Sequence, residues 1–414
     1  MNDLQQIKEI CQKTPDLLKN KDKFGYTPLH KYLLCANPTT EIVACLIRHG
    51  APETPRTTTG DTPLHTYLFN ANPTTGIVAF LIRNGVAVTS KNKNGDTPLH
   101  MYLRCANPTT EIVAYLIQHG ASVTSQNKYR DTPLHRYILN ANPTIEIVAC
   151  LIHHGAAVTS QNENRDTPLQ LYLRCANLKT EIVTCLIQYG TSVTSKNKDG
   201  NTPLHEYMRS NGPNLEAIDY FMKQGASVRA LNKDGNTPLH EYMRSNEPTL
   251  EVIDYFMKQC ASVTVLNKNR NKPINIYLER DDVKLEILFC LITNGVSPTL
   301  TKEEGSNALH VHLSGRYVKP TLEIVTYLIK LGVTPTLQNK DGSTPLHEYM
   351  RSNEPTLEVI DYITKQGASV TALNKDGNTL LHEYMRSIES TLEVVDYLVK
   401  QGASVTALNK VIMG

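Results

Sequence analysis

Tryptophan is absent from this 414-residue sequence and phenylalanine occurs only six times, whereas tyrosine occurs 20 times. Neither sign of charge is in excess, with 42 Lys and Arg against 40 Asp and Glu, so bulk charge gives no sign of a polyanionic partner. No apolar run approaches the ~18 residues that a membrane span needs. The start, MNDLQQIKEI, is polar and unlike a secretory signal. We expect a protein of the cytoplasm or nucleus, in a host cell where one exists, with no membrane span and no nucleic-acid partner.

Motifs that carry chemistry are also missing. No Cys-x-x-Cys pair and no glycine-rich phosphate loop occur in the sequence. The nine cysteines lie in apolar stretches, where a non-secreted chain keeps them as reduced, small apolar residues. We therefore predict no enzyme activity, no metal and no cofactor.

A short motif recurs along the whole sequence. Thr-Pro-Leu-His or a variant of it begins at a spacing of 35 residues, with one spacing of 37 residues from Asn307 to Thr344. Such periodicity is the signature of a repeat array. The motif is intact at seven positions and altered at four: Thr27, Thr62, Thr97, Thr132, Thr202, Thr237 and Thr344, then Thr167, Lys272, Asn307 and Thr379.

The unit that begins at Thr97 predicts two helices and a finger. Thr97 is suited to cap a short helix that begins at Pro98, and Asn107-Pro108 is expected to end it. Thr109 caps a second helix, and Gly120 follows that helix. The next stretch, ASVTSQNKYRD, is β-prone and then turn-prone, which favours a β-hairpin finger. Stacked units bury the apolar faces that a single unit leaves exposed.

These residues carry a family resemblance. The order TPLH, short helix, EIVxxLIxxGAxV and an Asn-Lys-Asp-Gly turn resembles the ankyrin repeat, over essentially the whole chain. The resemblance implies an all-α repeat solenoid of helix-turn-helix units with β-hairpin fingers that binds proteins. Two extra residues between the helices and a Tyr-Leu pair after TPLHx, as at Tyr32-Leu33, resemble the TPLHxYL-type ankyrin proteins of poxviruses and of obligate intracellular bacteria.

The array divides into four parts. We predict an N-terminal capping half-repeat (1–26), seven regular repeats (27–271), two degenerate repeats with an insertion near Ser314–Lys319 (272–343), and two regular repeats without a C-terminal cap (344–414). The degenerate pair is either a decayed copy that forms a soft junction or a bend that sets the angle between two binding arcs. Uniform hydrogen-exchange protection from 240 to 345 would contradict the soft junction.

Histidine and tyrosine recur once per unit, and each has two interpretations. The motif histidine could bind metal, but its place between stacked helices favours a hydrogen bond at the repeat interface. The tyrosine that begins the series at Tyr32 could stack nucleic-acid bases, but the matching position of ankyrin repeats is apolar. We therefore predict that the tyrosines belong to the core.

Charged residues mark the expected partner-binding face. A lysine stands four residues before most motifs, and in the later units a glutamate follows the motif histidine, where we expect it to face the concave side. Residues 1–201 carry 20 basic and 15 acidic side chains, and residues 202–414 carry 22 and 25. Solvated surface charge is the alternative interpretation. The candidate contacts are Glu206, Glu241, Glu348, Glu383, Lys198, Lys233, Lys268, Lys340 and Lys375.

The sequence thus predicts a non-enzymatic scaffold for a protein partner. If the narrower resemblance holds, the partner is a host protein and the role is host-range, immune evasion or effector activity. The alternative is a substrate-recognition subunit for a ubiquitin ligase whose F-box module is supplied in trans or lost, because poxvirus-like relatives commonly end in such a module. We also expect apolar surface at the uncapped C-terminal end, where a partner could dock.

Overall fold

The computed structural model describes residues 8–9, 12–52, 54–70, 72–105, 107–210, 212–280, 282–295, 305–314, 320–352, 354–386 and 390–407. Those residues form 22 α-helices and one short 3₁₀ helix, with no β-strand among them. The all-α repeat architecture is therefore confirmed. The chain divides into two compact units, 1–210 with 216–226, and 211–215 with 227–414.

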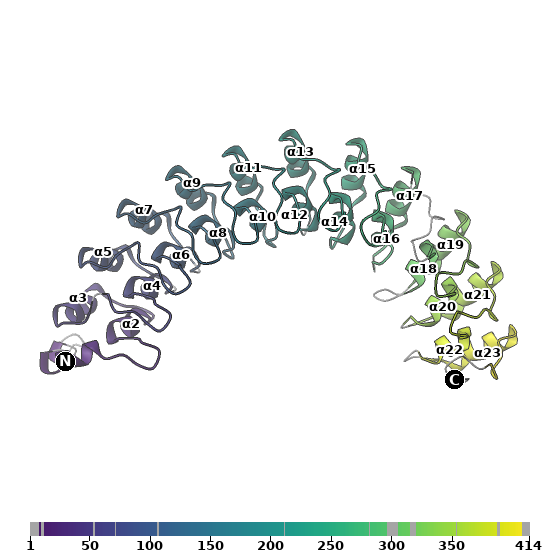
Figure 1. Cartoon of the computed structure of the whole chain (residues 1–414), viewed down its shortest axis with the longest axis horizontal. Helices are drawn as coiled ribbons and strands as arrows, with labels where there is room; N and C mark the ends of the chain where they lie inside the picture. Colours follow the sequence, from purple (N-terminus) through teal and green to yellow (C-terminus); the bar gives the residue numbers. More distant parts are fainter. Residues whose placement is uncertain are drawn as a thin grey trace. The chain divides into compact units, whose positions relative to one another are not determined.

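Unit 1 contains six helix pairs, each with a short first helix and a longer second helix (Figure 1). The 3₁₀ helix η1 (Pro15–Lys19) precedes them and buries Leu18. The pairs are α2 (Pro28–Leu33) with α3 (Thr40–Arg48), α4 (Pro63–Leu68) with α5 (Thr75–Arg83), α6 (Pro98–Tyr102) with α7 (Thr110–Gln118), α8 (Pro133–Ile138) with α9 (Ile145–His153), α10 (Pro168–Tyr172) with α11 (Thr180–Gln188), and α12 (Pro203–Arg209) with α13 (Leu215–Lys223).

Unit 2 continues the same pattern with five pairs, and the two degenerate repeats also form helix pairs. They are α14 (Pro238–Arg244) with α15 (Leu250–Lys258), α16 (Pro273–Tyr277) with α17 (Leu285–Thr293), α18 (Ala308–Leu313) with α19 (Leu322–Lys330), α20 (Pro345–Met350) with α21 (Leu357–Lys365), and α22 (Leu380–Tyr384) with α23 (Leu392–Lys400). The predicted insertion at 315–319 and the residues from 408 onward lie outside the described part of the chain.

The core of each unit runs between the two rows of helices. Leu99 and Tyr102 of α6 and Val113 and Leu116 of α7 are fully buried. Burying one such side chain contributes about 1.5–3 kcal/mol. The first helix ends at Tyr102, several residues before the Asn-Pro pair that the sequence suggested as its end. Thr109 caps α7 as predicted, and its hydroxyl accepts a hydrogen bond from the backbone N–H of Ile112.

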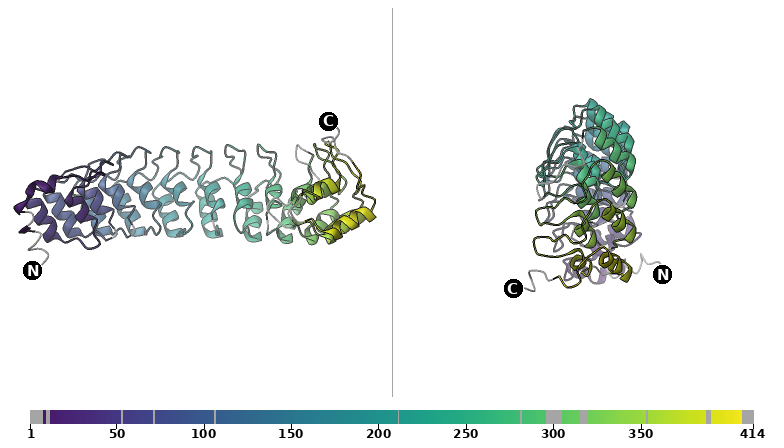
Figure 2. Two further views of the ribbon diagram at one scale, coloured as in Figure 1. Left: turned by 90° about the horizontal axis from the view of Figure 1, so that it is seen from below. Right: turned by 90° about the vertical axis from the view of Figure 1, so that its right-hand side faces the viewer.

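The fingers project from one side of the helices in each unit (Figure 2), but the expected β-hairpins are wrong in the part of the chain that is described. The described fingers are tight turns; in one of them, Asn92 N–H donates to the Asp96 carbonyl (3.0 Å) and Gly95 N–H donates to the Asn92 carbonyl (2.9 Å). The next backbone bond leaves the finger, because Lys93 N–H donates to Thr59 of the preceding finger (2.9 Å). Bonds between fingers therefore replace the ladder of a hairpin.

Three fingers carry arginine where the others carry glycine. Arg130, Arg165 and Arg270 adopt φ of +61°, +60° and +55°. These turns keep the left-handed conformation despite a strain of roughly 1–2 kcal/mol for a residue with a side chain. Cys260, which follows α15, is left-handed as well, with φ of +56°.

Candidate protein-binding surface

The motif histidines are structural. Thr97 N–H donates to Nδ1 of His100 (3.2 Å), which leaves the ring proton on Nε2, and Nε2 donates to the Asp131 carbonyl of the next repeat (3.1 Å). Burial lowers the pKa of His100 and lowers that of His30 and His310 to about 4. In these repeats a neutral imidazole therefore bonds to the next repeat. The predicted interface hydrogen bond is confirmed.

The tyrosines are core residues with a polar function. Tyr102 is fully buried, and its hydroxyl oxygen accepts a hydrogen bond from the N–H of Thr109 at the start of α7 (2.6 Å). The same contact joins Tyr242 to Thr249 (2.8 Å). The phenol thus satisfies a backbone donor at the N-terminus of the second helix. The sequence predicted the burial and missed the cap, although tyrosine and threonine recur seven residues apart.

The predicted lysines lie at the finger tips. Lys198, Lys233, Lys268, Lys340 and Lys375 are all exposed. The backbone N–H groups of Lys198, Lys268 and Lys375 each donate to a carbonyl of the preceding finger at 2.8 Å. These bonds fix the backbone of the finger tips from which the lysine side chains extend. Their contact with a partner stays a prediction.

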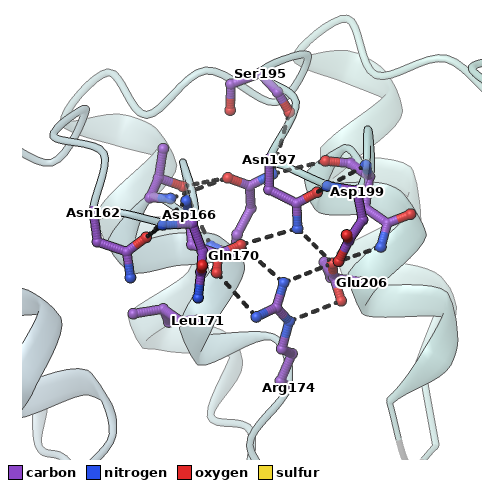
Figure 3. Close-up of polar contacts among 12 residues, drawn as sticks. Asn162, Asp166, Gln170, Leu171, Arg174, Ser195, Asn197, Asp199 and Glu206 are labelled. Atoms are coloured by element: carbon purple, nitrogen blue, oxygen red, sulfur yellow. Dashed lines mark hydrogen bonds and ion pairs between the residues drawn. The ribbon is translucent and has the colours of Figure 1, made fainter. Parts of the chain in front are cut away.

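Most of the predicted glutamates are buried and do not lie on an open surface. Glu206 is 2% exposed, and Glu241 and Glu383 are equally buried, whereas Glu348 is partly exposed. In Figure 3 the Glu206 carboxylate points into a polar cluster below the finger. The predicted contact role of the four glutamates remains untested.

The cluster around Glu206 is fully hydrogen-bonded. Arg174 donates from Nε to Oε2 (3.0 Å) and from Nη2 to Oε1 (2.9 Å), and the side-chain amides of Asn197 and Asn201 each donate to Oε1 at 2.9 Å. Arg174 also donates to both carboxylate oxygens of Asp166, at 2.8 and 3.0 Å (Figure 3). One guanidinium therefore bridges two carboxylates.

Electrostatics follow from this geometry. Burial raises the pKa of the Glu206 carboxyl, but the hydrogen bond and charge of Arg174, the hydrogen bond of Asn201 and the charge of Arg209 together hold the pKa below its usual value. Burial lowers the pKa of Arg174, and Glu206 and Asp166 raise it further than burial lowers it. The cluster is an ion triad in which two carboxylates share one cation.

The sequence contains a pattern that accompanies the burial of these glutamates. Early repeats carry Asp directly before the motif and no glutamate after it, as at Asp61, Asp96, Asp131 and Asp166. The repeats with glutamate carry Asn or Ser there instead, at Asn201, Asn236, Ser343 and Asn378. In the early form, Asn127 donates to the Asp96 carboxylate (2.7 Å). In the later form, Asn232 donates to Glu241 (3.1 Å). In these eight repeats the carboxylate thus moves from the finger to the helix.

Three exposed apolar side chains that the sequence analysis did not single out lie at the ends of first helices in unit 1. Leu34, Phe69 and Leu139 follow α2, α4 and α8 at equivalent positions, and they are 45%, 50% and 51% exposed. A shallow pocket of about 340 Å³ lies beside Leu139 and is lined by Arg104 and Arg136. In the sequence, each of these residues stands seven positions after the start of its motif, and they are 35 and 70 residues apart. This recurrence could have identified them.

An aromatic finger tip adjoins this pocket. Tyr129 is 43% exposed, and the guanidinium of Arg136 lies 5.8 Å and the ammonium of Lys128 lies 4.9 Å from its ring centroid. Cations over a ring face are attracted to it. Unit 1 therefore presents apolar and cationic groups together on its fingers and first helices.

Two classes of site are not seen in the described residues. No three His, Cys, Asp or Glu side chains gather there as a metal-binding group. Among the same residues, no helix has the length and apolar character needed to cross a bilayer.

Comparison with known proteins identifies the repeat. A family model of ankyrin repeats (3 copies) matches residues 67–162, 171–267 and 317–409. No curated protein matches the sequence. Ankyrin-repeat chains are typically non-enzymatic scaffolds for protein–protein interaction. Because the three matched segments cover more than half of the sequence, this chain belongs to the ankyrin-repeat family.

Proposed function

We propose that this chain is a scaffold that binds a partner protein through the fingers and first helices of unit 1. The observation that carries the proposal is the row of Leu34, Phe69 and Leu139, whose exposed apolar side chains recur at one position of the repeat. Exposed large apolar side chains in register are typical of interaction surfaces.

The charges on this surface favour an acidic partner segment. Arg104 and Arg136 flank Leu139, and Lys93 and Lys128 stand on the neighbouring finger tips. Such a cationic rim raises the association rate with an acidic segment and lowers it with a basic one. The finger lysines of the later repeats, beginning at Lys198, extend the same function.

The partner is a host-cell protein in this proposal, with a host-range, immune-evasion or effector role. Support comes from the TPLHxYL pattern alone, which resembles the ankyrin proteins of poxviruses and obligate intracellular bacteria. A ligase-adaptor role is the alternative, and cullin-complex subunits among the bound proteins would favour it.

Affinity purification from host-type cell lysate, followed by mass spectrometry, tests the proposal. The chain with Phe69→Ser and Leu139→Ser should lose the partner, because both side chains are half exposed and their removal leaves the core intact. The matched control carries Leu392→Ser and Val399→Ser on α23, which are also exposed. Loss of the partner in the control alone would contradict the unit 1 surface and favour docking near α23.

The partner found in this way also tests the charges. Lys93→Glu with Lys128→Glu should slow association severalfold at low salt and leave dissociation nearly unchanged, because rim charges act mainly on the encounter. Charge reversal at Glu206 is a poor test of contact, since its carboxylate is buried in the fold.

A further inference from the structure

A second surface lies on the outer row of unit 2. The second helices α15, α17 and α19 follow one another there (Figure 1), and a cavity of about 480 Å³ is lined by residues of all three. Its apolar wall consists of Leu250, Leu285, Phe289, Cys290 and Tyr327. This surface is distinct from the fingers and first helices of the proposed function.

Phe289 is unlike the residue at the same position of every other repeat. The fifth residue of the second helix is alanine in four repeats, threonine in two and aspartate in four: Ala44, Ala79, Ala114, Ala149, Thr184, Thr326, Asp219, Asp254, Asp361 and Asp396. Small or polar residues suit a solvated helix face. Phe289 is 58% exposed in the same place, so its ring adds an apolar surface that the repeat itself does not need.

The neighbouring repeats show what the phenylalanine replaces. Between α21 and α23, the Tyr397 hydroxyl donates to the Asp361 carboxylate (3.0 Å). The equivalent pair between α17 and α19 is Phe289 and Tyr327. Phenylalanine offers no acceptor, and the Tyr327 hydroxyl makes no hydrogen bond with any other described residue. The polar link is lost at this step, and a cavity with an apolar wall and one phenol lies there instead.

The charges around the cavity are mainly acidic. Helices α15, α17 and α19 carry four acidic and two basic side chains, and Asp254 and Glu286 line the cavity itself. Lys258 pairs with Asp254 at 2.8 Å, whereas Glu286 has no ion pair within the described residues. A basic side chain beside the cavity would meet Glu286 directly.

From this geometry we infer that the α15–α17–α19 cavity docks a basic peptide segment of a partner protein, which inserts one large apolar side chain against Phe289. The depression is open to solvent, and a central apolar anchor with a charged rim is the usual anatomy of a binding hot spot. Lys or Arg beside the anchor pairs with Glu286. The Tyr327 hydroxyl is a hydrogen-bond donor for the peptide backbone.

Fluorescence anisotropy with three labelled 12-residue peptides tests the inference on the full chain. The first peptide carries a central Leu-Phe pair flanked by lysines, the second has glutamates for the lysines, and the third has alanines for Leu-Phe. The first should bind at least tenfold more tightly than either twin. Equal binding by the glutamate twin, or by the alanine twin, would overturn the inference.

Two variants locate the binding. Phe289→Ala introduces the residue that four other repeats have, so the fold should persist, and the Kd for the lysine peptide should rise at least tenfold. Phe69→Ala removes a similarly exposed ring from unit 1 and should change that Kd less than twofold. Unchanged binding by Phe289→Ala, with an unchanged thermal unfolding curve, would refute the site.

A second copy of the chain is the competing occupant. Sedimentation velocity of the unmodified chain should show a monomer at micromolar concentration. Self-association that Phe289→Ala abolishes would overturn the peptide assignment and show that the cavity joins two copies. Failure of the unit 1 variants to lose a partner has no bearing on these measurements, so the two proposals fail separately.

Discussion

Arg174 holds Glu206 by two hydrogen bonds from the preceding repeat, Nε to Oε2 at 3.0 Å and Nη2 to Oε1 at 2.9 Å. The same relationship recurs in unit 2, where Arg351 donates to Glu383 at 2.8 and 3.1 Å. In both pairs the arginine stands 32 residues before the glutamate. The cation therefore joins consecutive repeats rather than a single helix.

Removing Glu206 should destabilise the array. Glu206→Ala removes the shared acceptor of the Asn197 and Asn201 amides, while Arg174, whose side chain is 39% exposed, keeps Asp166, so the free energy of unfolding should fall by about 1–3 kcal/mol. Urea unfolding measures this value. The control is Glu181→Ala, an exposed helix residue, which should change it by less than about 0.5 kcal/mol.

A double-mutant cycle separates the pair from its surroundings. Arg174→Met with Glu206→Ala should cost less than the sum of the two single changes, because the second change removes the charge that the first leaves unpaired. Strict additivity would show that Arg174 and Glu206 do not stabilise one another.

The histidines predict a pH dependence. Burial lowers the pKa of His30, His310 and His312 to about 4, while the unfolded chain keeps the ordinary value of about 6.5. The unfolded state therefore binds protons first. Stability is complete above about pH 6.5 and falls as the pH drops from 6.5 toward 4, by up to about 1.4 kcal/mol per pH unit for each such histidine.

One repeat supplies the control for this pH dependence. Gln170 replaces the motif histidine, accepts from Thr167 N–H (3.0 Å) and donates to the Asn201 carbonyl (2.8 Å), as a neutral imidazole does. His30→Gln should therefore stay within about 1 kcal/mol of the parent at pH 7.5. Thermal unfolding should show that it loses less stability between pH 7.5 and 5. If the stability of the two proteins changed with pH in parallel, His30 would not be a source of the pH dependence.

The tyrosine caps predict a third effect. Tyr102→Phe removes the acceptor of Thr109 N–H, a part-buried hydrogen bond, and should cost about 1 kcal/mol. Tyr115→Phe is the matched control. Its ring stacks on His119, and its hydroxyl has no hydrogen bond to any described residue, so urea unfolding should change by less than about 0.5 kcal/mol.

The fold followed from the sequence because most repeats carry the same local signals. Thr97, Pro98 and Thr109 specify where helices begin, and buried Leu99 and Val113 follow the expected period. The burial of Glu206 could not be predicted in the same way. Its position after the histidine resembles an exposed helix site, and its partner Arg174 becomes a neighbour only when repeats stack.

The fingers and the outer cavity were missed for related reasons. β-prone residues after Gly120 suggested strands, but the finger backbone bonds to adjacent fingers and to the side chain of Asn127, whose Oδ1 accepts from Asp131 N–H (3.0 Å). Phe289 occupies a position that is polar or small elsewhere, and its exposure depends on the neighbouring α15 and α19. Local signals specify the helices, whereas stacking decides which side chains remain at the surface.

Two nearly identical repeats give a reciprocal test of backbone strain. Thr237–Asn271 and Thr344–Asn378 agree at 29 of 35 positions, and one difference places Cys260 where the other repeat has Gly367. Both are left-handed, at φ of +56° and +97°, and a Cβ at Gly367 would contact nothing within 4 Å. The effect of exchanging the two residues therefore depends on backbone strain and not on side-chain crowding. Cys260→Gly should stabilise the chain by about 1 kcal/mol, and Gly367→Cys should destabilise it by a similar amount.

Thermal unfolding of the two variants under reducing conditions measures both changes. Reduction prevents the exposed Cys260 thiol from adding a disulfide between chains. The double variant exchanges the two residues and should unfold at nearly the temperature of the parent, because the sites are far apart in sequence and share no contact partner. If Gly367→Cys stabilised the chain, the cysteine side chain itself would make a favourable contact. The strain at Cys260 would then be compensated by that contact and would not lower the stability of the chain.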